Sequence, residues 1–534
     1  MRVERGLPDR RWLTVPAERT VLGVIHNVTS ATRLLDLLTA FEDDPRVRVV
    51  FTCTGSSAFE AGIAEFVAEH ELFFIPWEVA LREKFDLAVS TSRGGELEKI
   101  SAPLIGTPHG AGYNKKLSRN PESGIRNPES GAGAGAFGLS AEWLLHDGEV
   151  IPSAILLSHE EQQARLRQDC PEALPYAHVT GDPVLDELAA SRPFRTEYRA
   201  ALGIRPGQKF LLVTSTWSDR SLLGASFELI GRALAELPQD EYRVVAAVHP
   251  NAWYGHGGWQ IRTWLAACRR AGLLLPSPAE PTWKAAICAA DAFIGDHGSL
   301  SLYAAAQGLP GLLAAFDEHT VAPGSPMAWL GEQLPRVCPT RPLARQLADA
   351  VRLPAASGRV SSRPGRALAL FRELCYRQLR LSPPESGCPP RPVPLPEPPA
   401  APRSPVGRAL YVDAVVSGER VTLRRYPAEA QGRVTAHLGA EPHLLADEAE
   451  PEPRHRNSAE ILLARGSGPA ELFDRHPGCE LVVAEGRLYL RGGGVFTAAG
   501  ADPALAASAL LAGAEGSCTL EVGGTVQQLT LRPA

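Results

Sequence analysis

A proline-rich segment near the C-terminal end constrains the fold of this chain more than any other feature. Residues 381–405 (LSPPESGCPPRPVPLPEPPAAPRSP) contain 11 prolines in 25 positions. Proline lacks the amide hydrogen that helices and central strands need, and its ring fixes φ, so this segment cannot continue either element. We therefore predict a stiff, extended linker over residues 381–405, which separates residues 1–380 from a tail of residues 406–534.

Short apolar segments alternate with helical patterns throughout the large part of the chain. TVLGVIHN, RVRVVFTCTG and FDLAVSTS are strand-like before residue 190, and KFLLVTST, YRVVAAVHP and AFIGDHGS repeat the pattern after it. This alternation is typical of parallel sheets with helices on both faces. We predict the α/β fold class, with one domain over residues 16–190 and a second over residues 191–380.

The tail follows a different pattern. ERVTLRRY, ELVVAEGRLYLRGG and SCTLEVGGTVQQLTLRP alternate apolar and polar residues with a period of two, and glycine-containing turns separate them. We therefore predict a β-rich, antiparallel C-terminal module over residues 406–534. Residues 440–456 are expected to form a solvated acidic loop, and the duplicated NPES sequence within residues 119–138 is expected to form a surface loop.

The composition excludes several classes of protein. The 54 basic and 60 acidic residues give a net charge of −6, which argues against a general nucleic-acid binder. The nine cysteines are scattered without a CxxC pair, as in a protein with reduced thiols and no zinc site. No uninterrupted apolar run reaches about 18 residues, and the N-terminal residues lack the apolar core of a secretory signal. We therefore expect a cytoplasmic protein.

The first candidate binding loop is GTPHGAGYNKK, residues 106–116, which follows an apolar strand. Ligands of open parallel sheets bind beyond the carboxyl ends of the strands. A histidine side chain ordinarily titrates near neutrality, so His109 is a candidate general base. Gly110 allows a sharp turn, and Lys115 and Lys116 are point charges that would attract phosphate. A loop histidine with two solvated lysines is the structural alternative.

The second domain offers a strand–turn–helix candidate at residues 290–313. Asp296, Gly298 and Ser299 follow the strand AFIG and are suited to begin a helix. A helix N-terminus carries unpaired amides and a positive dipole end that bind phosphate, and the hydroxyls of Ser299 and Ser301 would add donors. A well-capped helix without a ligand is the structural alternative.

Three more strand ends belong to the same predicted edge. His249 ends the strand VVAAVHP, and Thr216 and Arg220 lie in VTSTWSDRSLLG, where they are candidate phosphate donors. Asp182 and Asp186 lie in VTGDPVLDEL; both could face the cleft, although we expect a structural role for Asp186. The segment VTSTWSDRSLLG is neither a Walker A loop nor a GxGxxG segment, so a nicotinamide or flavin cofactor is disfavoured there.

Two further polar residues lie at the predicted edge of the second domain. Glu280 lies between a strand and a helix and could contact a base or ribose. His256, in WYGHGGW, is expected to lie in a loop.

The order of these motifs resembles that of GT-B-type transferases. Within them it is similar to the CDP-glycerol glycerophosphotransferases, the teichoic-acid polymerase family, over residues 100–315. These enzymes carry an HG…K loop, a G-x-P-x-x-D segment, a P-T-W segment, an HP motif and a D-x-S-S turn before a helix. The matching residues here are His109 and Gly110 with Lys115 or Lys116; Gly181, Pro183 and Asp186; Thr216 and Trp217; His249 and Pro250; and Asp296, Gly298 and Ser299.

The chain departs from that family at two motifs. Ser218 follows Trp217 where the family has arginine, and the D-x-S-S turn is only half matched at residues 296–299. A more distant resemblance, to UDP-N-acetylglucosamine 2-epimerases, rests on the GDPVLD segment and the helix after DHGS, but their H-R-x-E-N segment is missing.

The resemblance implies two facing Rossmann-like domains, an acceptor domain at residues 16–190 and a nucleotide-donor domain at residues 191–380. It implies a transferase that moves a glycerophosphate or glycosyl group from a CDP- or UDP-linked donor to a polyol, glycan or lipid-linked acceptor in cell-envelope synthesis. His109 and His249 would be catalytic, and no cofactor or metal would be required. A lipid-linked acceptor would place the protein at the inner face of the membrane. The alternatives are a non-catalytic nucleotide- or sugar-binding scaffold and a UDP-sugar epimerase.

Overall fold

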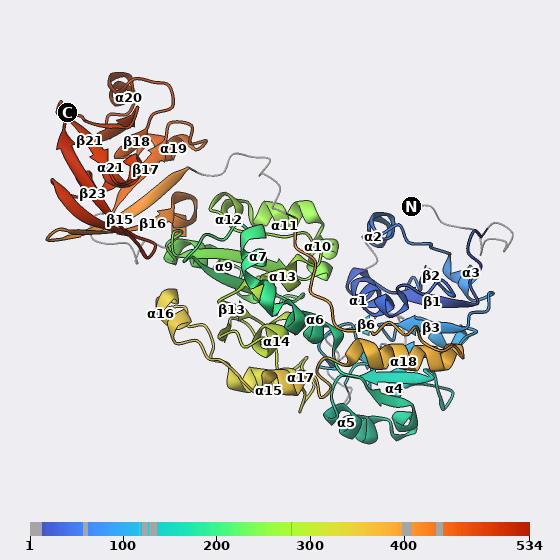
Figure 1. The fold of residues 1–534 in the computed structure, drawn as a ribbon. Coiled ribbons are helices and arrows are strands. Elements are labelled where there is room, and N and C mark those ends of the chain that lie inside the picture. The colour runs from blue at the N-terminus through green and yellow to red at the C-terminus, as the bar shows by residue number, and fades with distance from the viewer. Residues whose placement is uncertain are drawn as a thin grey trace.

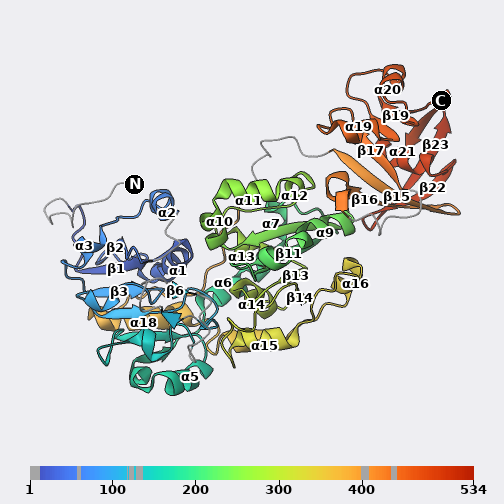
Figure 2. The same ribbon diagram turned by 180° about the vertical axis from the view of Figure 1, so that it is seen from behind.

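Three globular parts follow one another along the chain in the computed structural model (Figures 1 and 2). The structure describes residues 13–56, 62–116, 118–119, 126–127, 136–278, 280–397, 408–433 and 442–534. Most of the duplicated segment 119–138 therefore lies outside the described residues. In both views the tail contacts the second domain and lies at the end of the molecule remote from the first.

The first domain is built on a six-stranded parallel sheet of order β10-β9-β4-β3-β1-β2. Its strands are β1 (Arg19–Ile25), β2 (Val47–Cys53), β3 (Leu87–Ser90), β4 (Leu104–Gly106), β9 (Ala154–Leu157) and β10 (Ala177–Val179). A parallel bridge between Phe51 and Phe74 adds a short extended segment beyond β2. The chain runs from β1 to β2 toward one edge of the sheet, and from β3 through β4 and β9 to β10 toward the other edge. The space between β1 and β3 is therefore the switch point of a doubly wound sheet.

Alternate residues of β1 fill two apolar layers. Val21 and Ile25 pack with α1 (Val28–Leu38), α2 (Ile63–Glu69) and α18 (Ala367–Leu379) on one face. Leu22 and Val24 pack on the other face with α3 (Trp77–Ala80) and the short helix η3 (Leu97–Lys99). Burial on both faces explains why these strands are almost continuously apolar in the sequence.

The second domain repeats this architecture with the parallel order β12-β11-β13-β14. The strands are β11 (Lys209–Ser215), β12 (Tyr242–Val248), β13 (Ala292–Gly295) and β14 (Gly311–Leu313). Parallel bridges at Leu274 and Arg336 extend the sheet beyond β12 and β14. Its switch point lies between β11 and β13, as in a Rossmann-like sheet.

Helices cover both faces of the second sheet. One face carries α6 (Pro183–Ser191), α7 (Arg195–Ala201), α13 (Thr282–Ala289), α14 (Ser299–Ala306), α15 (Pro326–Gln333) and α17 (Ala356–Val360). The other carries α8 (Leu222–Ala225), α9 (Glu228–Glu236), α10 (Pro250–His256), α11 (Gly258–Trp264), α12 (Ala266–Arg270) and α16 (Leu343–Ala348). The region around His256, expected to be a loop, is therefore helical on both sides of Gly257, whose φ of 84° breaks the helix.

Helix α18 packs on the first domain although it follows the second domain in the chain (Figure 1). Phe371 and Leu374 join the apolar layer beneath β1, and Tyr376 donates a hydrogen bond to Asp44 at 2.7 Å. The segment predicted as residues 191–380 thus ends in a helix that the first sheet buries. Sequence pattern alone does not show which of two similar sheets a final helix covers.

The chain crosses between the two α/β domains at adjacent places. The amide of Asp182 donates to the Ser361 hydroxyl at 3.3 Å. The carboxylate of Asp186 accepts the amides of Gly365 and Ala367 at 2.6 and 3.0 Å. Asp186 therefore fixes the start of α18, which is the structural role expected for it.

The proline-rich segment contains no helix or strand over residues 381–397, but it packs against both domains. Arg391 pairs with Glu42 of the first domain. The carbonyl of Val393 accepts the Tyr198 hydroxyl at 2.6 Å, and its amide donates to Ser191 at 2.9 Å. Val393 is 4% exposed. This half of the predicted linker is therefore part of the two-domain body and not a spacer.

The tail forms one closed sheet of nine strands in the order β15-β16-β22-β23-β21-β20-β19-β18-β17. Its strands are β15 (Ala409–Ser417), β16 (Arg420–Pro427), β17 (His443–Asp447), β18 (Ile461–Leu463), β19 (Leu481–Ala484), β20 (Arg487–Leu490), β21 (Val495–Ala499), β22 (Ser517–Val522) and β23 (Thr525–Pro533). The tail is β-rich as predicted, but its sheet is mixed and not antiparallel throughout, because β16–β22, β17–β18 and β18–β19 pair in parallel.

Helices interrupt the strands of the tail. Helix α21 (Pro503–Leu511) is apolar around its whole circumference and joins the core of the closed sheet, contacting seven of the strands. The acidic stretch 440–456, expected to be a loop, contributes β17 and begins α19 (Pro453–Asn457); a second helix, α20 (Pro469–Arg475), packs on β19. Glu450 is fully buried there. Within the described ranges, no helix has both the length and the apolar character needed to cross a membrane.

Candidate functional site

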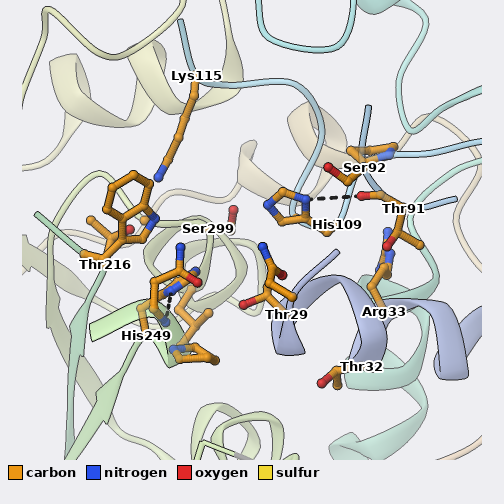
Figure 3. Close-up of a pocket in the computed structure, with 18 of the residues that line it drawn as sticks. Thr29, Thr32, Arg33, Thr91, Ser92, His109, Lys115, Thr216, His249 and Ser299 are labelled. Carbon is orange, nitrogen blue, oxygen red and sulfur yellow. Dashed lines mark hydrogen bonds between the residues drawn. The ribbon is translucent and has the colours of Figure 1, made fainter. Parts of the chain in front are cut away.

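A cavity of about 810 Å³ lies at the switch points of both parallel sheets. Residues that follow β1, β3 and β4 line its first-domain half, and residues that follow β11, β12 and β13 line its second-domain half. The carboxyl ends of the strands therefore meet in one space, which is where ligands of such sheets bind. Figure 3 shows side chains from both halves pointing toward each other across this cavity.

His109 lies in the loop after β4 and lines the cavity. Its Nδ1 is 3.2 Å from the carbonyl oxygen of Thr91, the bond dashed in Figure 3. A carbonyl oxygen only accepts, so Nδ1 carries the proton in the neutral ring. The lone pair is then on Nε2, the nitrogen that can take a proton from a substrate.

His249 ends β12 and shows the opposite arrangement. Its Nδ1 accepts the backbone amide of Asn251 at 3.0 Å, so the neutral ring carries its proton on Nε2. Burial lowers the pKa of His249 well below its ordinary value, and the charges of Lys115 and His109 lower it further. His249 is therefore a neutral hydrogen-bond donor.

The N-terminus of α14 faces the cavity through Gly298, Ser299 and Leu300. No side chain among the described residues caps this helix. The first-turn amides and the positive end of the helix dipole are therefore directed at the cavity, as in phosphate-binding helices.

Gly110 of the first domain lies directly against Ser299 of the second. A Cβ built at residue 110 would be 2.5 Å from the Ser299 Oγ, so glycine at this position permits the close approach of the two domains. Nearby, Lys115 and Val321 form an antiparallel bridge, and the amides of Lys116 and Ala322 donate to the carbonyls of Thr320 and Asn114. The first-domain loop is thus attached to the second domain by backbone hydrogen bonds.

Asp296 is not placed to bind a phosphate, although the sequence made it a candidate. Its Oδ2 accepts the amides of Thr216 and Leu222 at 2.8 Å each, and Oδ1 accepts the amide of Gly298 at 2.9 Å. Burial raises the pKa of Asp296 to about 6 in spite of these bonds. The carboxylate joins the loops after β11 and β13.

Ser301 is also structural. Its Oγ bonds to the Thr214 hydroxyl at 3.0 Å and accepts the amide of Asp296 at 3.1 Å, and the residue is fully buried. Of the residues expected on this turn, Gly298 and Ser299 reach the cavity and Ser301 holds them in place from beneath.

Lys115 reaches from the first-domain loop toward the second domain (Figure 3). Its Nζ lies 5.0 Å from the centre of the Trp217 ring. Burial lowers the pKa of Lys115 to about 8, and the charge of Asp296 opposes that shift. An anion in the cavity would restore the charge of the lysine, because an opposite charge nearby favours the protonated form.

Several expected residues do not line the cavity. Lys116 follows Lys115 but is not among the residues that line the cavity. Arg220 pairs with Asp317 at 3.1 Å and is largely exposed, so the phosphate role expected for both residues has no support from their positions. Thr216 does line the cavity, whereas Asp182 and Glu280 do not. Glu280 accepts the Thr282 hydroxyl at 3.0 Å.

Two buried arginines of the cavity were missed by the sequence reasoning. Arg33 lies on α1 and Arg93 in the loop after β3, and each is 4% exposed. The sequence does hold a feature that points to both arginines. Polar residues directly follow the apolar strands TVLGVI and FDLAV, at the strand ends where ligand contacts are expected. His297, also unassigned, lines the second-domain half, and burial lowers its pKa to about 4.

A group of potential metal ligands lies in the tail, outside the cavity. In the part of the chain that the structure describes, Glu429, Glu450 and His455 place their ligand atoms within 4.8 Å of one another. Glu429 already pairs with Arg270 at 3.2 Å, and Glu450 accepts the amides of Arg408 and Glu452. These contacts satisfy part of the acidic group without an ion.

Sequence comparisons find no relative of this chain: no protein-family model matches, and no curated protein matches significantly. Structure comparisons find similar folds at low identity. The wall teichoic acid polymerase TagF is 14% identical with a TM-score of 0.46, over 68% of this chain and 89% of that one.

Two further solved structures cover the same part of the chain. A Listeria monocytogenes protein described as a UDP-N-acetylglucosamine 2-epimerase is 14% identical with a TM-score of 0.42, over 70% of this chain and all of that one. HepE from Anabaena, in complex with UDP-glucose, is 11% identical with a TM-score of 0.37, over 68% and 98%. The families that the motifs resemble are thus among the structures similar to this chain.

Proposed function

We propose that this chain is a transferase that moves a glycerophosphate or glycosyl group from a nucleotide-activated donor to an acceptor hydroxyl. The two α/β domains face each other across the cavity; the second holds the donor and the first holds the acceptor. Nucleotide-activated donors are cytoplasmic metabolites, so the proposed reaction takes place in the cytoplasm. When the acceptor is lipid-linked, the reaction takes place at the inner face of the membrane.

One observation carries the proposal: the Nδ1 atoms of the two cavity histidines contact opposite kinds of partner, a carbonyl oxygen and a backbone amide. His109 keeps its Nδ1 proton on the Thr91 carbonyl and presents an unprotonated Nε2. His249 accepts an amide at Nδ1 and presents a protonated Nε2. A base and a hydrogen-bond donor on opposite walls of one cavity are the two groups that group transfer to a hydroxyl needs.

In the proposed reaction, His109 Nε2 takes the proton from the acceptor hydroxyl as the oxygen forms a bond to the transferred group. The bond between that group and the nucleotide phosphate breaks, and the leaving phosphate gains negative charge. His249 Nε2 and the first-turn amides of α14 at Ser299 stabilise that charge. Lys115 adds a cation from the first domain, and its charge increases as the anion approaches.

The nucleoside of the donor fits the wall that continues from this diphosphate position. Pro276, Pro278 and Trp283 line the cavity in the second domain, and the Trp283 ring stacks on Tyr303 with 6.1 Å between centroids. Such rigid apolar groups accept a flat base without ordering flexible side chains. CDP- and UDP-linked donors are the candidates that the sequence resemblance favours.

A thermal-shift screen of the full-length protein tests the donor. CDP, UDP, dTDP and GDP are added alone and as glycerol or sugar conjugates. A ligand at about 100 times its dissociation constant adds about 2.7 kcal/mol of stability, which is visible as a higher melting temperature. We expect one nucleotide class to stabilise the wild type, and Ser299→Ala and His249→Ala to weaken that effect. The absence of any shift would refute the proposal.

Product analysis then tests the chemistry. With a stabilising donor and acceptors of each class, His109→Gln should lower turnover by about 10²–10⁴-fold and leave donor affinity unchanged. Lys116→Gln, a neighbour outside the cavity, is the matched control. Saturable donor binding without product would favour a binding scaffold, and epimerised donor would favour a UDP-sugar epimerase.

A further inference from the structure

The first-domain half of the cavity contains a buried arginine without a counter-ion. Arg93 is 4% exposed and forms no ion pair with any of the described residues. Its Nη2 donates to the Tyr113 hydroxyl at 3.1 Å. Its Nε and Nη1 are buried and have no hydrogen-bond partner in the structure. The buried guanidinium therefore lacks a counter-charge among the described residues.

The surrounding residues are built to hold this guanidinium. Arg93 Nη1 lies over the Cα of Gly106, where a Cβ would be 1.4 Å from the nitrogen, so any other residue at 106 would displace it. Tyr113 donates its own hydroxyl proton to the Leu156 carbonyl at 3.0 Å and therefore accepts from Arg93. Gly138 makes room for the Tyr113 ring, since a Cβ there would lie 2.9 Å from it.

The other buried arginine of the cavity, Arg33, has a counter-ion and serves as a comparison. Its Nη2 pairs with the fully buried carboxylate of Asp182 at 3.1 Å, and Tyr303 donates to the same carboxylate at 3.0 Å. Arg33 is therefore part of the junction between the domains. Arg93 has no such carboxylate, and an uncompensated buried charge is strongly unfavourable.

We propose that Arg93 forms an oxyanion subsite, so that the acceptor carries a phosphate or carboxylate group besides its reactive hydroxyl. This inference rests on the proposed transferase function and names the class of acceptor. The oxyanion supplies the counter-charge for the guanidinium of Arg93, which lines the cavity. Thr29, whose buried Oγ1 also lacks a hydrogen-bond partner, lines the same cavity.

The placement of the subsite suits an acceptor rather than the donor. In Figure 3, His109 lies between the Lys115, Ser299 and His249 side chains and the first-domain side chains of Thr91, Ser92 and Arg33. An acceptor anchored in the first-domain half therefore directs its hydroxyl toward His109. The donor diphosphate occupies the other half, at α14.

Calorimetric titration of the full-length protein tests this subsite. The donor half is first saturated with the nucleotide diphosphate that binds in the screen, and the protein is then titrated with glycerol 3-phosphate, with glycerate and with uncharged glycerol. We expect one anion to bind and glycerol not to bind, and the two anions distinguish a phosphate from a carboxylate subsite. Binding of neither anion overturns the inference while leaving the donor site intact.

Variants separate Arg93 from the donor site. Arg93→Met should weaken anion binding by about tenfold or more, because charge-assisted hydrogen bonds are lost, and should leave nucleotide affinity unchanged. Arg82→Met, at an exposed arginine of the same domain, should change neither. Gly106→Ala should reproduce the Arg93→Met result by displacing the guanidinium. A loss of nucleotide affinity with retained anion binding would overturn the inference.

Stability gives a readout that does not depend on any ligand. Because Arg93 is a buried charge without a counter-ion, Arg93→Met should keep or raise the melting temperature of the ligand-free protein. Arg33→Met should lower it, since it leaves Asp182 buried without its partner. If no nucleotide binds to the wild type, the anion titration is made without one. Arg93-dependent binding would then support the subsite although the transferase proposal had failed.

Discussion

Lys115→Met should make the ligand-free protein more stable at neutral pH. Burial lowers the pKa of Lys115 from 10.5 to about 8. Each pKa unit is equivalent to about 1.4 kcal/mol, so the charged side chain is disfavoured by about 3 kcal/mol in the empty cavity. The side chain is partly exposed, and screening by water reduces this figure. We expect a gain of about 1–3 kcal/mol in the free energy of unfolding at pH 7.

The sign of the effect depends on pH. Below pH 8, Lys115 is charged in both the folded and the unfolded chain, and the folded state bears the full cost. Between pH 8 and 10.5 the folded protein loses this proton before the unfolded chain does, so the stability of the wild type rises with pH. The advantage of the methionine variant should therefore be largest near pH 7 and shrink toward pH 10.

Urea unfolding followed by tryptophan fluorescence at pH 7, 8.5 and 10 measures this difference. Lys116→Met is the matched control, because Lys116 is the next residue in the chain and lies outside the cavity. The same Lys115 variant should bind the nucleotide more weakly. Equal stability differences at all three pH values, or a Lys115→Met protein less stable than the wild type at pH 7, would refute the electrostatic reasoning.

Two further changes test the contacts between domains. Tyr303→Phe removes the hydrogen bond to the buried carboxylate of Asp182 and should lower the free energy of unfolding by about 1.5–3 kcal/mol in urea titrations, with nucleotide binding retained. Asp240→Asn breaks the bidentate pair with Arg425, at 2.7 and 2.8 Å, and should let the tail separate from the second domain, seen as a larger radius of gyration in small-angle scattering. Asp349→Asn, at an exposed ion pair of the same domain, should leave the radius unchanged.

The sequence predicted the parts of the site that depend on local pattern. Apolar strands followed by polar residues located His109, His249 and Ser299, because the carboxyl ends of parallel strands meet at one edge. The α/β class of the large part followed from the same alternation. These features depend on the geometry of residues that are close in the sequence. The spacing of apolar residues and the positions of turn residues indicate that geometry.

The sequence did not predict what distant residues do to each other. Asp296 is a plausible ligand in the sequence, but amides from two other loops occupy its carboxylate. Arg220 and Asp317 form an ion pair across 97 residues, which removes the arginine from the site. Arg93 could be recognised only when its burial and the space above Gly106 were known. The parallel pair of β16 with β22 likewise joins segments far apart in the chain.

The two adjacent crossings of the chain between the α/β domains limit how the cavity can open. Asp182 bonds to Ser361 and Asp186 bonds to Gly365, so both crossings lie side by side. Motion of the domains about these two neighbouring connections would also have to break the backbone hydrogen bonds that join residues 114–116 to residues 320–322. The contact between Gly110 and Ser299 joins the two domains within the cavity. Opening the cavity by such a motion would separate these two residues, and closing it would bring the two halves of the site together again.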